Sequence, residues 1–145
     1  MISGPVLLAQ DQGSLTSDEQ QFKDSIEALN LDFETISKAK ESYNRGIEFF
    51  KQSDYQDCIN EFDQSVQLFP GFLNAYFNRG VAYLMLEKYR KAIIDFSTVI
   101  DSNSTKPLAY FKRAEAYSSL GEFSKSVLDY RDVIKLQPAN EKAFY

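Results

Sequence analysis

Hydrophobic residues recur at helical spacing along most of the chain. In residues 89–100, apolar side chains are three or four residues apart, at Tyr89, Ala92, Ile93, Phe96, Val99 and Ile100. This spacing places them on one face of an α-helix. No segment alternates apolar and polar residues as a half-buried strand would. We therefore predict an all-α fold.

The pattern repeats every 34 residues. The segments YNRGIEFF, FNRGVAYL and FKRAEAYS begin at positions 43, 77 and 111, and a second set (YQDCINEF, YRKAIIDF and FSKSVLDY) begins at 55, 89 and 123. Pro70-Gly71 and Pro138 end units, and Gly121 separates the two halves of one. We predict three helical hairpins, over 39–72, 73–106 and 107–140.

This unit resembles the tetratricopeptide repeat, which joins two helices in 34 residues. The glycine position of the repeat holds Gly46, Gly80 and Ala114, and the tyrosine position holds Phe49, Tyr83 and Tyr117. In the second helix, the small-residue position holds Cys58, Ala92 and Ser126, and the aromatic position four residues later holds Phe62, Phe96 and Tyr130. The match spans about 100 residues. The resemblance implies a right-handed superhelix of stacked hairpins.

One departure from the family pattern is itself periodic. Its leucine position holds Arg45, Arg79 and Arg113, and an acid follows each of them 16 residues later, at Glu61, Asp95 and Asp129. Because an arginine near a core needs a partner, we predict a ladder of ion pairs. The pairs could lie within each hairpin or join the acid of one hairpin to the arginine of the next.

Cys58 is expected to be a buried spacer. It occupies the position where the family has a small residue that lets paired helices approach. A reactive thiol is the alternative, and it would require an electropositive, partly exposed setting.

The N-terminal part is acidic. Seven acids and two lysines in residues 1–38 account for the whole net charge of −5. An apolar stripe there comprises Phe22, Ile26, Leu29, Phe33 and Ile36. We predict a flexible tail over 1–17 and a helical cap over 18–38, because terminal repeats need cover. Alternatively, this segment occupies the groove of its own or a neighbouring molecule.

Residues 141–145 are expected to begin a further helix, with Phe144 in the tryptophan position of the repeat. The third hairpin would then have an apolar edge. That edge could form a homo-oligomer, or the chain could be a fragment of a longer array.

The resemblance implies that the first helices of the hairpins line a concave face that binds peptides or helices. The residues expected to bind are Tyr43, Asn44, Ile47, Phe50, Asn74, Phe77, Asn78, Val81, Met85, Leu108, Phe111 and Lys112. Tyr43, Phe77 and Phe111 form an aromatic row, and Asn44, Asn78 and Lys112 form a polar row that could bond a peptide backbone. The face becomes polar in the third hairpin, at Glu115, Ser118 and Ser119.

Some co-chaperones of this family clamp the C-terminal carboxylate of heat-shock chaperones with two basic or amide pairs and one asparagine. The matching positions are Tyr43, Ile47, Asn78, Leu108 and Lys112. Only Asn78 matches outright, and Lys112 matches in charge. We predict no such clamp, because three members that would pair with an anion are missing.

Catalysis is not expected. The chain has no histidine, one cysteine and no glycine-rich phosphate-binding motif, which removes the usual general base and Cys–His nucleophile. No cofactor or metal is predicted, nor any small-molecule substrate. Residues 1–38 are acidic and the rest of the chain is neutral overall, which disfavours binding to nucleic acid. The absence of a membrane span and of disulfides favours the cytoplasm, with export or membrane association remaining open.

We therefore predict a protein-interaction scaffold or adaptor. The alternatives are a self-assembling structural module and a regulatory or targeting segment of a larger protein.

Overall fold

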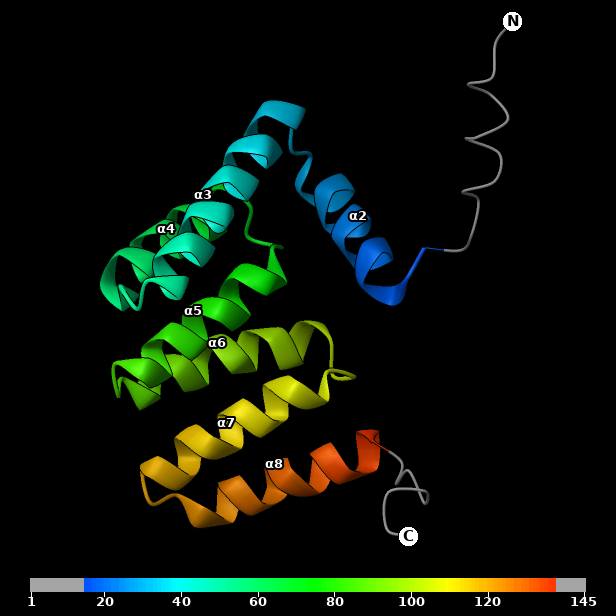
Figure 1. Ribbon diagram of the computed structural model, residues 1–145. Helices are drawn as coiled ribbons and strands as arrows, with labels where there is room; N and C mark the ends of the chain where they lie inside the picture. Colours follow the sequence, from blue (N-terminus) through cyan, green and yellow to red (C-terminus); the bar gives the residue numbers. More distant parts are fainter. Residues whose placement is uncertain (1–14, 138–145) are drawn as a thin grey trace, which may run out of the picture. The chain divides into compact units, whose positions relative to one another are not determined.

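The computed structural model describes residues 15–137, and its chain divides into two compact units, Met1–Leu31 and Asp32–Tyr145. Most of the expected tail and the expected helix at 141–145 therefore lie outside the described residues. The described part is all helical (Figure 1), with α2 Ser17–Leu29, α3 Phe33–Lys51, α4 Tyr55–Leu68, α5 Leu73–Met85, α6 Tyr89–Ser102, α7 Pro107–Ser119 and α8 Phe123–Leu136.

The first unit contains α2. The Thr16 hydroxyl accepts a hydrogen bond from the Glu19 N–H, and the Glu19 carboxylate accepts one from the Thr16 N–H. This capping box satisfies two backbone donors at the helix start. Asn30 ends α2 in the left-handed conformation. None of the side chains of α2 is buried.

The second unit is a stack of three hairpins, α3–α4, α5–α6 and α7–α8 (Figure 1). The second helix of each hairpin packs on the first helix of the next, α4 on α5 and α6 on α7. Asp32 caps α3 by accepting from the Thr35 N–H at 2.7 Å, so α3 begins six residues before the expected repeat. The apolar stripe of the N-terminal part is thus shared between α2 and α3.

The two helices of each hairpin are joined by the same tight turn. Its middle residue has positive φ in all three hairpins, at Ser53 (61°), Glu87 (56°) and Gly121 (75°). Only glycine adopts this conformation without steric cost. The second helix begins directly after each turn. Asp54 is the N-cap of α4 without a side-chain hydrogen bond, so the turn itself positions the helix start.

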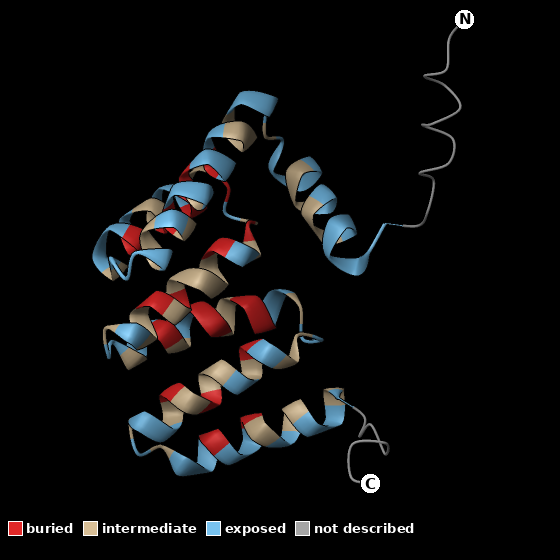
Figure 2. Ribbon diagram, viewed as in Figure 1, coloured by how far each residue is buried: buried red, intermediate tan, exposed pale blue. Residues whose placement is uncertain are grey.

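The core lies between the helices of the stack (Figure 2). Small residues of the first helices meet aromatic rings of the second helices. A Cβ added at Gly46 would lie 2.7 Å from Phe62, and one at Gly80 would lie 2.8 Å from Phe96. Cys58 is fully buried, as a spacer between helices should be. Close approach of the paired helices therefore depends on these small side chains.

Candidate functional site

The candidate surface is built by α3, α5 and α7, the first helices of the hairpins. Its expected binding residues divide into two groups. Five are exposed, Asn44, Asn74, Met85, Leu108 and Phe111. Seven are half-buried, Tyr43, Ile47, Phe50, Phe77, Asn78, Val81 and Lys112. The exposed group can contact a ligand directly, whereas the half-buried group also packs within the domain.

The aromatic row belongs partly to the core. The Phe77 ring lies 5.5 Å from that of Phe96, and Phe111 lies 5.6 Å from Tyr130. Tyr43 contacts Phe72 at 4.8 Å between ring centroids. Each first-helix ring therefore packs against another aromatic ring of the stack, which orients it. Phe111, 38% exposed, keeps the largest free edge of the row.

Asn78 and Tyr43 are joined across the first two hairpins. The Asn78 side-chain amide donates to the Tyr43 hydroxyl at 2.8 Å. Burial raises the pKa of the Tyr43 hydroxyl above its ordinary value, so it stays protonated and polar but uncharged. A ligand that used this amide would have to share or displace an existing hydrogen bond.

The members of the polar row differ in how far they are already engaged in contacts. Asn44 is exposed on α3, where its amide can both donate and accept. Lys112 forms an ion pair with Glu115 at 2.8 Å and lies 5.6 Å from the centroid of the Phe111 ring. The ammonium group is thus already engaged at the polar end of the surface, and Ser118 and Ser119 beyond it are exposed.

The expected ladder of arginine–acid pairs is present within the hairpins. Arg45 pairs with Glu61 at 2.9 Å, Arg79 with Asp95 at 2.6 Å and Arg113 with Asp129 at 2.7 Å. Asp95 and Asp129 are buried, and both their oxygens accept from the arginine. Bidentate geometry of this kind is specific to arginine.

Sequence analysis missed a second set of contacts. Arg79 also donates to Asp63 of the preceding hairpin at 2.7 Å, and Arg113 donates to Ser97 at 2.9 Å. Asp63 and Ser97 lie 16 residues before their arginines, as the buried acids lie 16 residues after them. The same spacing read backwards could have revealed them. The arginines therefore join neighbouring hairpins as well as the helices within each.

In the second and third hairpins the arginine lies beside the aromatic residue at the repeat's tryptophan position, which is Tyr76 or Tyr110. The Arg79 guanidinium lies 5.3 Å from the Tyr76 ring centroid, and Arg113 lies 5.7 Å from that of Tyr110. Ser42 occupies this position in the first hairpin and accepts from Arg45 at 3.0 Å. A ring therefore lies beside the guanidinium in the second and third hairpins, and a serine hydroxyl takes its place in the first.

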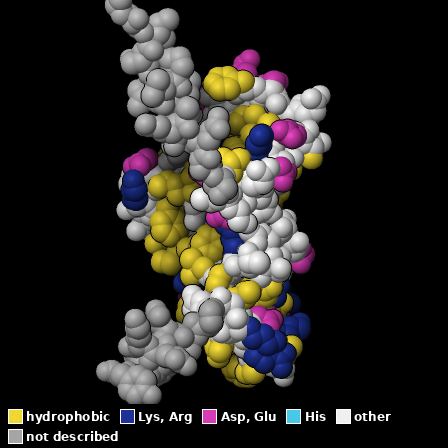
Figure 3. Space-filling view, turned by 90° about the vertical axis from the view of Figure 1, so that its right-hand side faces the viewer, with side chains coloured by type: hydrophobic (Ala, Val, Ile, Leu, Met, Phe, Trp, Pro, Cys, Tyr) yellow, Lys and Arg dark blue, Asp and Glu magenta, His cyan; other side chains and the backbone are white. Residues whose placement is uncertain are grey.

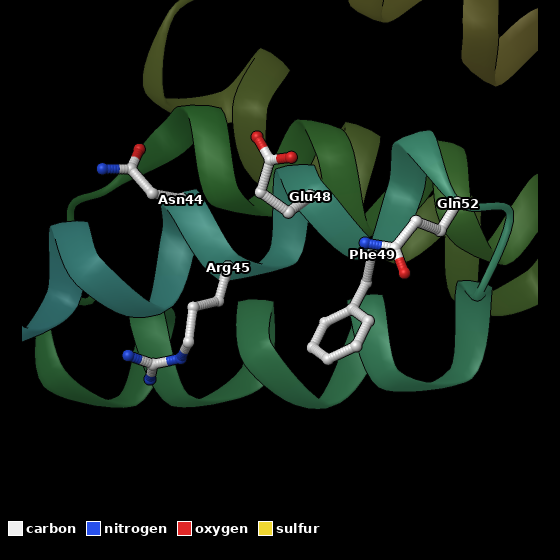
Figure 4. Close-up of a pocket in the computed structure, with 5 residues that line it drawn as sticks. All are labelled: Asn44, Arg45, Glu48, Phe49 and Gln52. Carbon is white, nitrogen blue, oxygen red and sulfur yellow. The ribbon is translucent and has the colours of Figure 1, made fainter.

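A depression of about 300 Å³ lies along α3, lined by Asn44, Arg45, Glu48, Phe49 and Gln52 (Figure 4). Arg45 and Phe49 point to one side of the helix and Asn44 and Glu48 to the other. The equivalent residues of the second hairpin, Arg79 and Tyr83, are half-buried, and Arg79 reaches the preceding hairpin. The depression is therefore lined both by Asn44, an expected binding residue, and by Arg45 and Phe49, whose equivalents in the second hairpin lie beside the preceding hairpin.

Hydrophobic side chains also gather in a band on the face drawn in Figure 3, with a cluster of lysine and arginine toward one end. Within residues 15–137 there is no cluster of potential metal ligands. No described helix is long and apolar enough to cross a membrane.

Comparisons with known proteins agree with this architecture. The tetratricopeptide-repeat family model matches residues 73–106 and 108–140. No curated protein sequence matches the chain.

Three solved structures illustrate the structural similarity. The first TPR domain of Spaghetti (RPAP3) bound to an HSP90 peptide is 27% identical, with a TM-score of 0.70 over 79% of this chain and 88% of that one. The second TPR domain of human RPAP3 with an HSP70 peptide is 26% identical, with a TM-score of 0.66 over 76% and 89%. The Arabidopsis OM64 TPR domain, at 22% identity, shares the fold, with a TM-score of 0.70 over 76% and 91%.

Proposed function

Because this chain belongs to the tetratricopeptide-repeat family, we propose that it is an interaction module that holds an extended or helical segment of a partner protein. The segment would lie along α3, α5 and α7. The observation that carries the proposal is the exposure of five side chains on these helices, Asn44, Asn74, Met85, Leu108 and Phe111. Together they offer amide groups for a peptide backbone and apolar surface for its side chains.

We further propose that the module does not clamp a chaperone carboxylate. RPAP3 domains of similar fold have been solved with HSP90 and HSP70 peptides, so the two modes of binding must be separated by experiment. In this chain Tyr43 and Ile47 stand where a clamp has basic or amide groups, and Leu108 replaces another. Asn78, the one matching residue, already donates to Tyr43. An anionic terminus would find few donors there.

The binding proposal can be tested with a displayed library of random 12-residue peptides. Selected peptides are then titrated by fluorescence anisotropy against the chain and its variants. Asn44→Ala and Leu108→Ala should each weaken binding, by about 1 kcal/mol or more at a contact residue. Asn60→Ala and Ile94→Ala, at exposed positions of the second helices, serve as matched controls. Equal binding by all four variants would place the site elsewhere.

The clamp is tested separately with the peptide SRMEEVD, as the free acid and as the C-terminal amide. We expect no binding that depends on the free carboxylate. A clear preference for the free acid, lost in Lys112→Ala and Asn78→Ala, would establish a clamp despite its missing members.

A further inference from the structure

The outer face of α8 resembles surfaces that are covered elsewhere in the stack. In α4, Ile59 and Val66 are 3% and 8% exposed beneath the next hairpin. The residues 68 positions later, Val127 and Ile134, are 64% and 72% exposed. They have the same apolar character on the same helix face. The face made by Val127, Arg131 and Ile134, here called the α8 end face, is therefore suited to receive another helix.

The charge at the centre of the α8 end face is opposite to the charge at the equivalent position of α4. Between the two apolar positions, α4 has Asp63 and α6 has Ser97, and each accepts a hydrogen bond from the arginine of the following hairpin. The equivalent residue of α8 is Arg131, which is exposed. An incoming helix with the repeat's usual arginine would bring two guanidinium groups together.

The positive charge of Arg131 disfavours stacking of identical copies of the chain. In a head-to-tail stack built like the internal one, Arg45 of one copy would meet Arg131 of the next. Two-fold packing of α8 on its own copy would bring the two Arg131 side chains together near the symmetry axis. Both arrangements place like charges in an apolar contact, which is unfavourable. The charge of Arg131 therefore counts against the expected homo-oligomer at this edge.

We propose that the α8 end face binds an amphipathic helix of a partner protein that carries a carboxylate opposite Arg131. The helix packs apolar residues on Val127 and Ile134, one turn to either side of the ion pair. Its carboxylate accepts from Arg131, which reverses the donor and acceptor of the Arg79–Asp63 contact. The end face thus selects acidic helices and rejects helices with arginine at that position.

The test uses a helix that already packs in this manner. Two peptides of residues 73–86 are prepared, one natural and one with the substitution Arg79→Glu, and each is titrated by fluorescence anisotropy against the intact chain. We expect the substituted peptide to bind about tenfold more tightly than the natural one, because only its new carboxylate can pair with Arg131. In an Arg131→Asp chain the preference should reverse.

Lys125→Asp provides the matched control. It makes the same change of charge on α8 at a position that is exposed in all three hairpins, as Asp57, Lys91 and Lys125, so the preference should be unchanged. Circular dichroism checks that each variant is folded. The proposal is overturned if neither peptide binds, which would mean that another part of the chain covers the face, or if Arg131→Asp leaves the preference as it was.

Discussion

Arg79 and Asp95 form a two-pronged ion pair inside the second hairpin. Arg79 Nε lies 2.8 Å from Asp95 Oδ2, and Nη2 lies 2.6 Å from Oδ1. Asp95 is only 2% exposed, and its burial raises its pKa even though Arg79 opposes the shift. A carboxylate in this setting depends on its partner, because an unpaired buried charge is costly.

Replacing Arg79 should therefore be severe. Arg79→Ala removes both donors to Asp95 and the link to Asp63, and we expect the free energy of unfolding to fall by about 3–5 kcal/mol. Urea denaturation measures the loss. Arg45→Ala is the matched control, since the Arg45 side chain is 50% exposed, and it should cost about 1 kcal/mol or less. Similar losses in the two variants would contradict this account.

Gly80 sets the spacing between α5 and α6. A Cβ there would lie 2.8 Å from the Phe96 ring, so Gly80→Ala should lower stability by about 1–3 kcal/mol through overpacking. The smaller side chain of Phe96→Leu should reduce the cost of the alanine, which a double-mutant cycle by thermal or urea unfolding would detect. If the effects of the two substitutions simply add, the contact is not the cause.

Glu87 carries backbone strain that glycine would relieve. Its φ is 56°, in the turn where the third hairpin has Gly121 at 75°. Glu87→Gly should stabilise the chain by about 0.5–1 kcal/mol, since glycine adopts this conformation freely. Gly121→Ala should destabilise it by a similar amount, although a Cβ there has open space around it. Differential scanning calorimetry would show opposite shifts in Tm, and shifts of the same sign would refute the interpretation.

Cys58 should make stability depend on alkaline pH. Burial raises the pKa of its thiol to about 11, from an ordinary value of 9.0. The folded state therefore keeps the proton over a range where the unfolded chain loses it, so the free energy of unfolding falls as pH rises from about 9 to 11. Comparing urea unfolding of the natural chain with Cys58→Ala at pH 8 and 10.5 isolates this contribution. Equal pH dependence in both chains would mean that the thiol is not protected.

Much of the fold was predictable because repeats pack mainly against their immediate neighbours. Apolar spacing located the six helices of the three hairpins, and the 34-residue period paired them. The periodic spacing identified Asp95 and Asp129 as partners of the arginines, and the structure showed that each pairs within its own hairpin, with Arg79 and Arg113. Asp63 was missed, because its equivalents in the other two hairpins, Ser97 and Arg131, are not acids and no periodic acid marks the position.

The candidate site was less predictable. Helical periodicity placed Tyr43, Phe77 and Phe111 on one face, but how far each ring is covered depends on the neighbouring hairpins. Tyr43 is half-buried against Phe72 and bonded to Asn78, whereas Phe111 keeps an exposed edge. Whether these side chains contact a ligand stays a prediction.

The sequence by itself determined the helices, their pairing and the repeat, because each follows from residues close together along the chain. Tertiary structure decided which of those residues remain accessible and which charges find partners. Val127 and Ile59 occupy the same position of the repeat, yet one is exposed and the other buried. The repeat had already predicted an apolar edge on the third hairpin. How far each side chain is exposed depends on the helices packed around it, as α5 packs on α4 beside Ile59, and the local pattern of apolar residues does not determine this.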